Sequence, residues 1–189
     1  MDFIELARLR RSVRRFENRP VEPEKIAELM AIAERAAVAF DARDAALLVV
    51  DDPAKADLLR KTIVSGWAGK INVWIYATAF PAVLILLGRP DADPPADDRP
   101  FYLARASLLM ETAVLAAAEM GLGTCWMAGF NEANVAKALG LPPAWRPIIV
   151  SPLGHPAAKG RLENVSRSVA QSDRRVPLEE IYDIRGGQS

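Results

Sequence analysis

The sequence predicts a globular domain in which helices cover both faces of a central sheet, of either the α/β or the α+β class. The chain of 189 residues is 51% apolar and 25% charged, which is typical of a folded domain with a sizeable core. Short continuous apolar runs, as in strands buried on both faces, alternate with segments whose apolar residues recur every three to four positions. Such interleaving favours layers of helices on both sides of a sheet.

Caps and periodicity place the elements of the first half. Pro23 suits the first turn of a helix, because its missing N–H is not needed there. The apolar positions that follow it share one helix face: Ile26, Leu29, Met30, Ala33, Ala36 and Ala37. Asp52 and Pro53 form the N-cap and first-position signal of a later helix. The expected elements are helices over residues 3–9, from Pro23 to about 37, 53–61 and 64–79 (with Trp67 and Trp74), and buried strands over 45–50 and 81–87.

The second half contains the most apolar helix of the chain. Residues 102–120 are apolar around most of the helix circumference, as in a helix buried on nearly all sides. A monomer of 189 residues has little room to surround such a helix, so we expect a second subunit to cover part of it. The other expected elements are a mobile loop over 89–100, a short helix capped by Asn131 and ended by Gly140, and strands over 124–128 and 147–153.

Composition excludes several functional classes. Lys and Arg number 24 and Asp and Glu number 24, so the formal net charge is 24 − 24 = 0, and no global field favours nucleic acid or an anionic membrane. One cysteine excludes an intramolecular disulfide, and one histidine excludes a two-histidine metal site. The chain begins without an apolar signal segment, and its most apolar run, Phe80 to Leu87, is far shorter than the about 20 residues that span a bilayer. We therefore expect a cytoplasmic protein without a metal.

The N-terminal region carries a cluster of six arginines: Arg8, Arg10, Arg11, Arg14, Arg15 and Arg19. If the segment after the first helix is extended, Arg10, Ser12 and Arg14 project to one side and form a phosphate clamp. A solvated charged surface explains the same composition, and a site for nucleic acid is a third, weaker interpretation.

Other candidate motifs do not indicate a catalytic side chain. The turn from Gly121 to Trp126 follows a helix and lacks the third glycine of a dinucleotide fingerprint. Cys125 lies in an apolar run, where cysteine usually acts as a small buried hydrophobe. His155 follows a strand in a turn, where a structural role is more common than acid–base work. The charged group Asp41, Arg43 and Asp44 is compatible with either a solvated loop or a ligand contact.

Taken together, three blocks of the chain resemble the nitroreductase family of FMN enzymes. They are RRSVRRF at residues 10–16, MGLGTCWMAGF at 120–130 with the LGLP that follows at 139–142, and PIIVSPLGHP at 147–156 with RVPLEEI at 175–181. The blocks stand in the order of the family, so the resemblance covers nearly the whole chain. It implies a single α+β domain over residues 1–189, a three-layer sandwich with a mixed central sheet, an intertwined homodimer, and a C-terminal extension over 157–189 that reaches the partner subunit.

The resemblance also implies roles for individual positions. Four residues of the first block would hold the phosphate and ribityl chain of FMN: Arg10, Arg11, Ser12 and Arg14. Arg175, together with Arg174, would reach the phosphate from the C-terminal tail. The backbone of three residues of the second block would lie near the isoalloxazine ring: Met127, Ala128 and Gly129. The missing side chain of Gly129 would let backbone approach a flat ring closely.

One stretch departs from the family pattern. Family members usually have serine, asparagine and glutamine after the second helix, whereas Val38, Asp41 and Arg43 occupy these places here. The usual hydrogen bonds to the ribityl chain and ring edge would be altered or lost, and an aspartate near a reduced, anionic flavin would be unfavourable unless Arg43 pairs with it. Asn72 is a candidate for a compensating polar contact.

The resemblance implies an FMN-dependent oxidoreductase. NAD(P)H would reduce the flavin, which would pass electrons to a nitroaromatic, a quinone or a related small-molecule acceptor. No catalytic side chain is required, which agrees with the shortage of histidine and cysteine. The departure within residues 37–45 leaves an alternative open, a flavin-binding protein that does not turn over NAD(P)H.

Overall fold

Four strands pair into a single sheet in the computed structural model, which describes residues 2–38, 44–65, 70, 72–90 and 100–158. The spatial order of the strands is β1-β2-β4-β3, and every neighbouring pair is antiparallel. The sheet is expected to be mixed, but its described strands are all antiparallel; the parallel pairing is an isolated bridge between Ser12 and Thr124, outside the strands. The strands are β1 (Ala45–Val50), β2 (Ala82–Gly88), β3 (Gly123–Thr124) and β4 (Arg146–Gly154).

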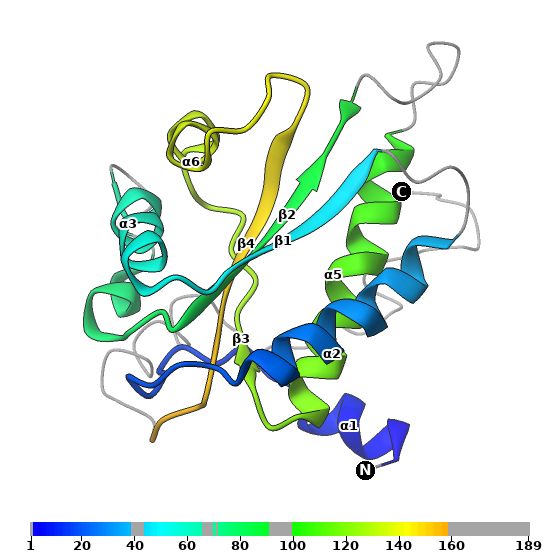
Figure 1. Cartoon of the computed structure of the whole chain (residues 1–189). Helices are drawn as coiled ribbons and strands as arrows, with labels where there is room; N and C mark the ends of the chain where they lie inside the picture. The colour runs from blue at the N-terminus through cyan, green and yellow to red at the C-terminus, as the bar shows by residue number, and fades with distance from the viewer. Residues whose placement is uncertain (1, 39–43, 66–69, 71, 91–99, 159–189) are drawn as a thin grey trace, which may run out of the picture.

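Helices cover both faces of this sheet, so the molecule has three layers (Figure 1). Helices α2 (Pro23–Glu34) and α5 (Phe101–Glu119) pack on one face, and α3 (Pro53–Ile63) and α6 (Glu132–Leu139) pack on the other. Helix α1 (Phe3–Leu9) contacts α5 and buries none of its residues. Two short 3-10 helices complete the described elements, η1 (Arg35–Val38) and η2 (Val73–Ala77). The predicted α+β sandwich is confirmed.

The central strand β2 is buried along its whole length. Its residues alternate between two hydrophobic clusters, because successive side chains of a strand point to opposite faces. Ala82, Leu84 and Leu86 pack with residues of α2 and α5. Val83, Ile85 and Leu87 pack in the second cluster, with residues of α3 and α6. The continuous apolar run that predicted a doubly buried strand is thereby explained.

The predicted caps are confirmed by their hydrogen bonds. Asp52 accepts from the N–H of Lys55 at 2.8 Å, and Asn131 accepts from the N–H of Asn134 at 2.9 Å. Gly140 ends α6 with a left-handed φ of 64°, a conformation that glycine adopts without steric cost. Each of these signals is local in sequence, so the helix limits they mark could be predicted closely.

Two predicted elements differ from the structure. The single helix expected over residues 64–79 is not formed, because Val64 and Ser65 lie in a turn and the described part near Trp74 is the short 3-10 helix η2; Trp67 lies outside the described residues. The strand expected over 124–128 is only Gly123–Thr124, followed by an isolated bridge between Met127 and Val150. In both stretches tertiary contacts, and not local periodicity, decide the backbone path. Residues 91–99 of the loop predicted over 89–100, and residues 159–189 of the extension predicted over 157–189, also lie outside the described residues.

Helix α5 combines a buried face with an exposed apolar one. Seven of its residues are buried against the sheet and α2: Ala106, Leu109, Met110, Ala113, Val114, Ala116 and Ala117. Leu108, on another face, is 55% exposed. By length and composition alone α5 could cross a membrane, but the core helix of a soluble protein passes the same test. Its buried face shows that α5 serves as a core helix here.

Candidate functional site

The arginine segment, residues 10–16, is attached directly to β3, which lies within the second sequence block, residues 120–130. The N–H of Val13 donates to the carbonyl oxygen of Thr124 at 2.8 Å, next to the parallel bridge between Ser12 and Thr124. The Val13 side chain is buried. Gly123 makes the close approach possible, because a Cβ at this position would lie 2.8 Å from Cβ of Val13. Two blocks more than 100 residues apart in sequence therefore meet at one place.

Burial along the arginine segment follows the predicted alternation. Arg10, Ser12 and Arg14 are partly buried, whereas Arg11 and Arg15 are exposed. Arg10 lies against α5, with Nη2 3.6 Å from the carboxylate of Glu111. The Nε of Arg10 is buried and has no hydrogen-bond partner among the described residues. Arg10 therefore retains a donor that no group of the described residues satisfies.

The second block contributes backbone groups to the same region. Met127 exchanges two hydrogen bonds with Val150, at 2.9 and 3.0 Å, and its side chain is buried. Its N–H and C=O are therefore engaged in pairing. The next two N–H groups, of Ala128 and Gly129, have no acceptor within the described part of the chain. Two consecutive N–H groups without an acceptor form a backbone donor pair suited to a ligand oxygen or nitrogen.

Two further side chains belong to this region. Asn72, which precedes η2, donates from Nδ2 to the carbonyl oxygen of Gly129 at 3.5 Å. The polar contact for which Asn72 was a candidate is therefore made to the backbone that was predicted to bind the ring. The indole Nε1 of Trp126 is buried and has no acceptor among the residues described. Nothing in the sequence could identify that donor, because satisfaction of an indole N–H depends on tertiary neighbours.

Some of the predicted residues cannot be placed. Arg174, Arg175 and residues 39–43 lie outside the described residues. Asp44 is described; it is buried and forms an ion pair with Arg105 of α5. A structural role thus accounts for Asp44. Cys125 is buried as expected.

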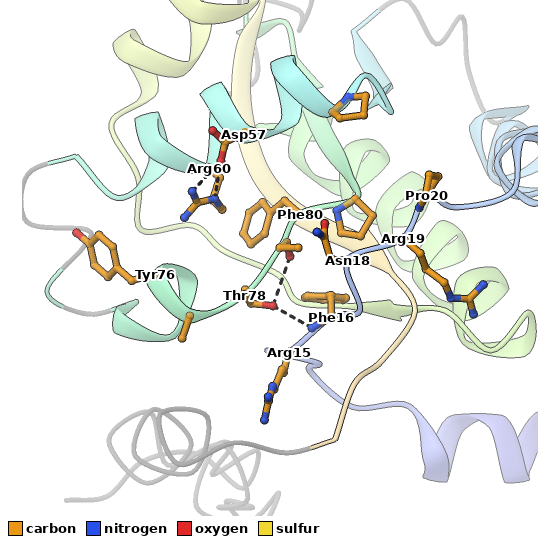
Figure 2. A pocket seen from close by; sticks show the side chains of 14 residues that line it. Arg15, Phe16, Asn18, Arg19, Pro20, Asp57, Arg60, Tyr76, Thr78 and Phe80 are labelled. Carbon is orange, nitrogen blue, oxygen red and sulfur yellow. Dashed lines mark hydrogen bonds and ion pairs between the residues drawn. The ribbon is translucent and has the colours of Figure 1, made fainter.

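The described residues line several cavities. A cavity of about 200 Å³ lies between α1 and β3, lined among others by Arg10, Arg11 and Thr124. Another, of about 210 Å³, is lined among others by Ala128 and Phe130. A larger cavity, about 670 Å³, lies between α3, η2 and residues 15–20 (Figure 2). We place the candidate site at the two smaller cavities, because Arg10 and Ala128, whose donors have no acceptor among the described residues, line them.

The donor set suits an anionic, planar cofactor. The groups present are guanidiniums, a hydroxyl and backbone N–H groups, which bind a phosphate and the polar edge of a ring well. Within the described residues, no group of three or more His, Cys, Asp and Glu could hold a metal ion. The buried Nε of Arg10 and the N–H groups of Ala128 and Gly129 therefore fit the phosphate and ring of FMN.

Solved structures of other proteins share this fold. A nitroreductase family protein from Clostridium difficile 630 is 23% identical, with 98% of this chain and 99% of that chain covered at a TM-score of 0.75. A candidate NADH dehydrogenase/NAD(P)H nitroreductase from Parabacteroides distasonis is 27% identical, with coverage of 83% and 88% and a TM-score of 0.65. An FMN-dependent nitroreductase from Clostridium difficile R20291 is 20% identical, with coverage of 84% and 90% and a TM-score of 0.68. No curated protein matches the chain in sequence.

The sequence profile of the nitroreductase family matches residues 7–73 and 73–155. These two matches include the arginine segment, which the structure joins to β3, and Asn72 and Gly129, which it brings into contact. The chain belongs to the nitroreductase family.

Proposed function

We propose that this protein is an FMN-dependent oxidoreductase that passes electrons from NAD(P)H through bound flavin to a small-molecule acceptor such as a nitroaromatic or a quinone. One observation carries the proposal: the bond from Val13 to Thr124 holds a partly buried arginine segment against β3, four residues before Ala128, where two backbone N–H groups have no acceptor among the described residues. Membership of the nitroreductase family supports an oxidoreductase, and one structure of the same fold is named FMN-dependent.

Different residues would bind different parts of the cofactor. Arg10, Ser12 and Arg14 would bind the phosphate and ribityl chain, with Arg11 adding positive charge from the exposed side. The N–H groups of Ala128 and Gly129 would bind the polar edge of the ring, and Met127 would hold this backbone in place through Val150. Arg174 and Arg175 would add phosphate contacts from the tail.

When bound, FMN supplies the electron-transfer chemistry. The chain supplies binding, orientation and positive charge, so no side chain needs to act as a general acid or base. We assign no catalytic side chain to this site.

We further propose that the functional unit is a cytoplasmic homodimer that binds neither nucleic acid nor membrane. Helix α1 has no buried residue, and Phe3, Ile4 and Leu9 on it are large apolar side chains exposed to solvent. Leu108 of α5 adds to the exposed apolar surface. Burial of these side chains by a second copy would give the apolar helix α5 the cover that its sequence predicts.

The test is a visible absorption spectrum of the purified protein with and without added FMN, followed by anaerobic addition of NADH or NADPH. We expect a flavin spectrum that bleaches on reduction and returns with an acceptor. A colourless protein that binds no added FMN would overturn the proposal. The changed segment around Val38, Asp41 and Arg43 favours the second candidate function: a yellow protein that neither nucleotide reduces would establish flavin binding without turnover.

A further inference from the structure

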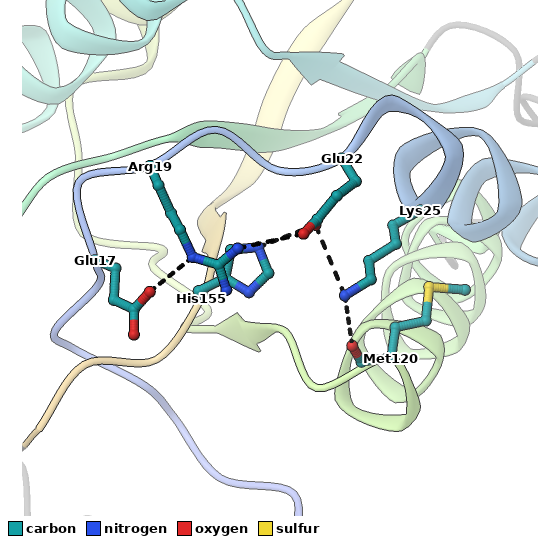
Figure 3. A network of polar contacts seen from close by, with 6 residues as sticks. All are labelled: Glu17, Arg19, Glu22, Lys25, Met120 and His155. Carbon is teal, nitrogen blue, oxygen red and sulfur yellow. Dashed lines mark hydrogen bonds and ion pairs between the residues drawn. The ribbon is translucent and has the colours of Figure 1, made fainter.

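The only histidine of the chain lies in a polar network that includes no residue of the candidate site (Figure 3). The Nε2 of His155 is 3.0 Å from the carboxylate of Glu22. The histidine side chain is 8% exposed, whereas that of Glu22 is 41% exposed. A buried imidazole thus reaches outward to a carboxylate just before α2, and contacts of this kind hold two segments in a defined relative position.

The backbone around His155 is paired with the continuation of the arginine segment. The N–H of Glu17 donates to the carbonyl oxygen of His155 at 2.9 Å. The N–H of Ala157 donates to the carbonyl oxygen of Arg15, also at 2.9 Å. An antiparallel bridge between Phe16 and Pro156 lies between them. The arginine segment is therefore attached at two places. Its residue Val13 bonds to Thr124, and residues 15–17 pair with residues 155–157.

The Glu22 end of the network reaches the turn before β3. Lys25 lies 3.7 Å from the Glu22 carboxylate and donates to the carbonyl oxygen of Met120 at 3.3 Å. Arg19 also contacts Glu22, at 3.3 Å, and contacts Glu17 at 2.7 Å. The network thus links the end of β4, the start of α2 and the end of α5, which lie around the arginine segment.

We propose that His155 is a positioning residue for FMN binding. Through its side-chain bond to Glu22 and its backbone bond to Glu17, it holds the arginine segment at the distance from β3 that binding of the phosphate requires. The inference rests on the proposed function, and His155 itself does not touch the cofactor.

The acceptor of this contact is a carboxylate. A backbone hydrogen bond is the largest cause that holds the pKa of Glu22 below its ordinary value of 4.5, with His155 and Lys25 acting in the same direction. Glu22 is therefore anionic at neutral pH. A hydrogen bond to an ionised acceptor is stronger than one between neutral groups, so the contact with Glu22 suits a positioning role.

The test measures the FMN dissociation constant of flavin-free protein at pH 7, by quenching of flavin fluorescence. His155→Leu removes the side-chain bond to Glu22 and is expected to raise this constant about threefold to tenfold. His155→Gln keeps a hydrogen-bond donor, and we expect it to stay within about twofold of wild type.

Two carboxyl variants serve as a matched pair. Glu22→Gln should weaken FMN binding, and combined with His155→Leu it should add little, because both changes remove the same contact. Glu24→Gln makes the same chemical change at an exposed residue in the first turn of α2 and should leave binding unaltered. Hydrogen exchange provides a readout without flavin: the amides of Val13 and Glu17 should exchange faster in His155→Leu than in wild type.

The possible failures are distinguishable. If wild type binds FMN but His155→Leu binds it equally tightly, and Glu22→Gln behaves like Glu24→Gln, the positioning role is wrong while the proposed function stands. If wild type binds no FMN, the proposed function fails first. If His155→Leu does not fold, Glu22→Gln and its control Glu24→Gln still decide the question.

Discussion

The N–H of Val13 donates to the carbonyl oxygen of Thr124 at 2.8 Å, and this bond joins the arginine segment to the strand that leads toward Ala128 and Gly129. Without it, the guanidiniums and the unsatisfied backbone N–H groups would belong to separate parts of the surface. The predictions below test this arrangement and the surfaces around it.

Arg14→Ala is expected to weaken FMN binding about tenfold to a hundredfold, because a partly buried phosphate would lose a charge-assisted hydrogen bond worth about 1.5–3 kcal/mol. Arg15→Ala removes the same charge from the adjacent residue, whose side chain is exposed and lines the large cavity, away from the candidate site (Figure 2). It should change the affinity by about twofold at most. Titration with FMN measures both variants. Equal losses would mean that the phosphate site does not follow the alternation of the segment.

Gly123→Ala is expected to destabilise the protein by about 1–3 kcal/mol, because the new methyl group would lie 2.8 Å from the Val13 side chain. The same change should reduce FMN affinity, since it pushes the arginine segment away from β3. Urea unfolding and FMN titration measure the two effects. Gly121→Ala is a useful comparison. The added methyl group would have no neighbouring atom within 4 Å, whereas the backbone at Gly121 has a φ of +74°. It should lose stability through backbone strain and keep its flavin affinity.

Leu108→Asp is expected to shift the protein from dimer to monomer, because it would bury a charge in the proposed interface. Leu58→Asp is the matched control. Leu58 is 51% exposed on α3, compared with 55% for Leu108 on α5, so the two substitutions have similar cost in a monomer. Light scattering after gel filtration would report the mass of each. A Leu108→Asp protein that remains dimeric would place the interface elsewhere.

Glu132→Gln is expected to lower stability at pH 7 and to have little effect below about pH 3. Hydrogen bonds from Arg146, at 2.6 and 2.7 Å, are the largest cause that lowers the pKa of Glu132 from its ordinary value of 4.5. Because the folded state lowers this pKa, the stabilisation is present above pH 4.5 and is lost as the pH falls through the folded value. Both side chains are largely exposed, so the loss should be about 0.5–1 kcal/mol. Urea unfolding at pH 7 and pH 3 would show it, and an equal loss at both values would contradict the ion pair.

The strands and most of the helices could be predicted because their signals are local. The doubly buried run of β2, the caps Asp52 and Asn131, and the left-handed Gly140 each depend on neighbouring residues only. The stretch at 64–79 could not be predicted in the same way. Val64 and Ser65 turn, and Trp74 is buried in a 3-10 helix, because packing against the rest of the core outweighs the weak local preference for one longer helix.

In the candidate site, too, some features could be predicted from the sequence and others depend on the tertiary structure. The positive charge of the arginine segment and the small residues Ala128 and Gly129 are visible in the chain. The engagement of Met127 with Val150, and the bond from Asn72 to Gly129, depend on which segments lie side by side.

The sequence alone determined the alternation of strands and helices, the position of the positive charge and the resemblance to the nitroreductase family, because these depend on residue type and spacing. The tertiary structure decided which donors remain for a ligand and how His155 is connected to the arginine segment. The physical reason is that a polar group is satisfied or left unsatisfied by its neighbours in space, and residues 13 and 124, or 22 and 155, become neighbours only when the sheet and its covering helices have assembled.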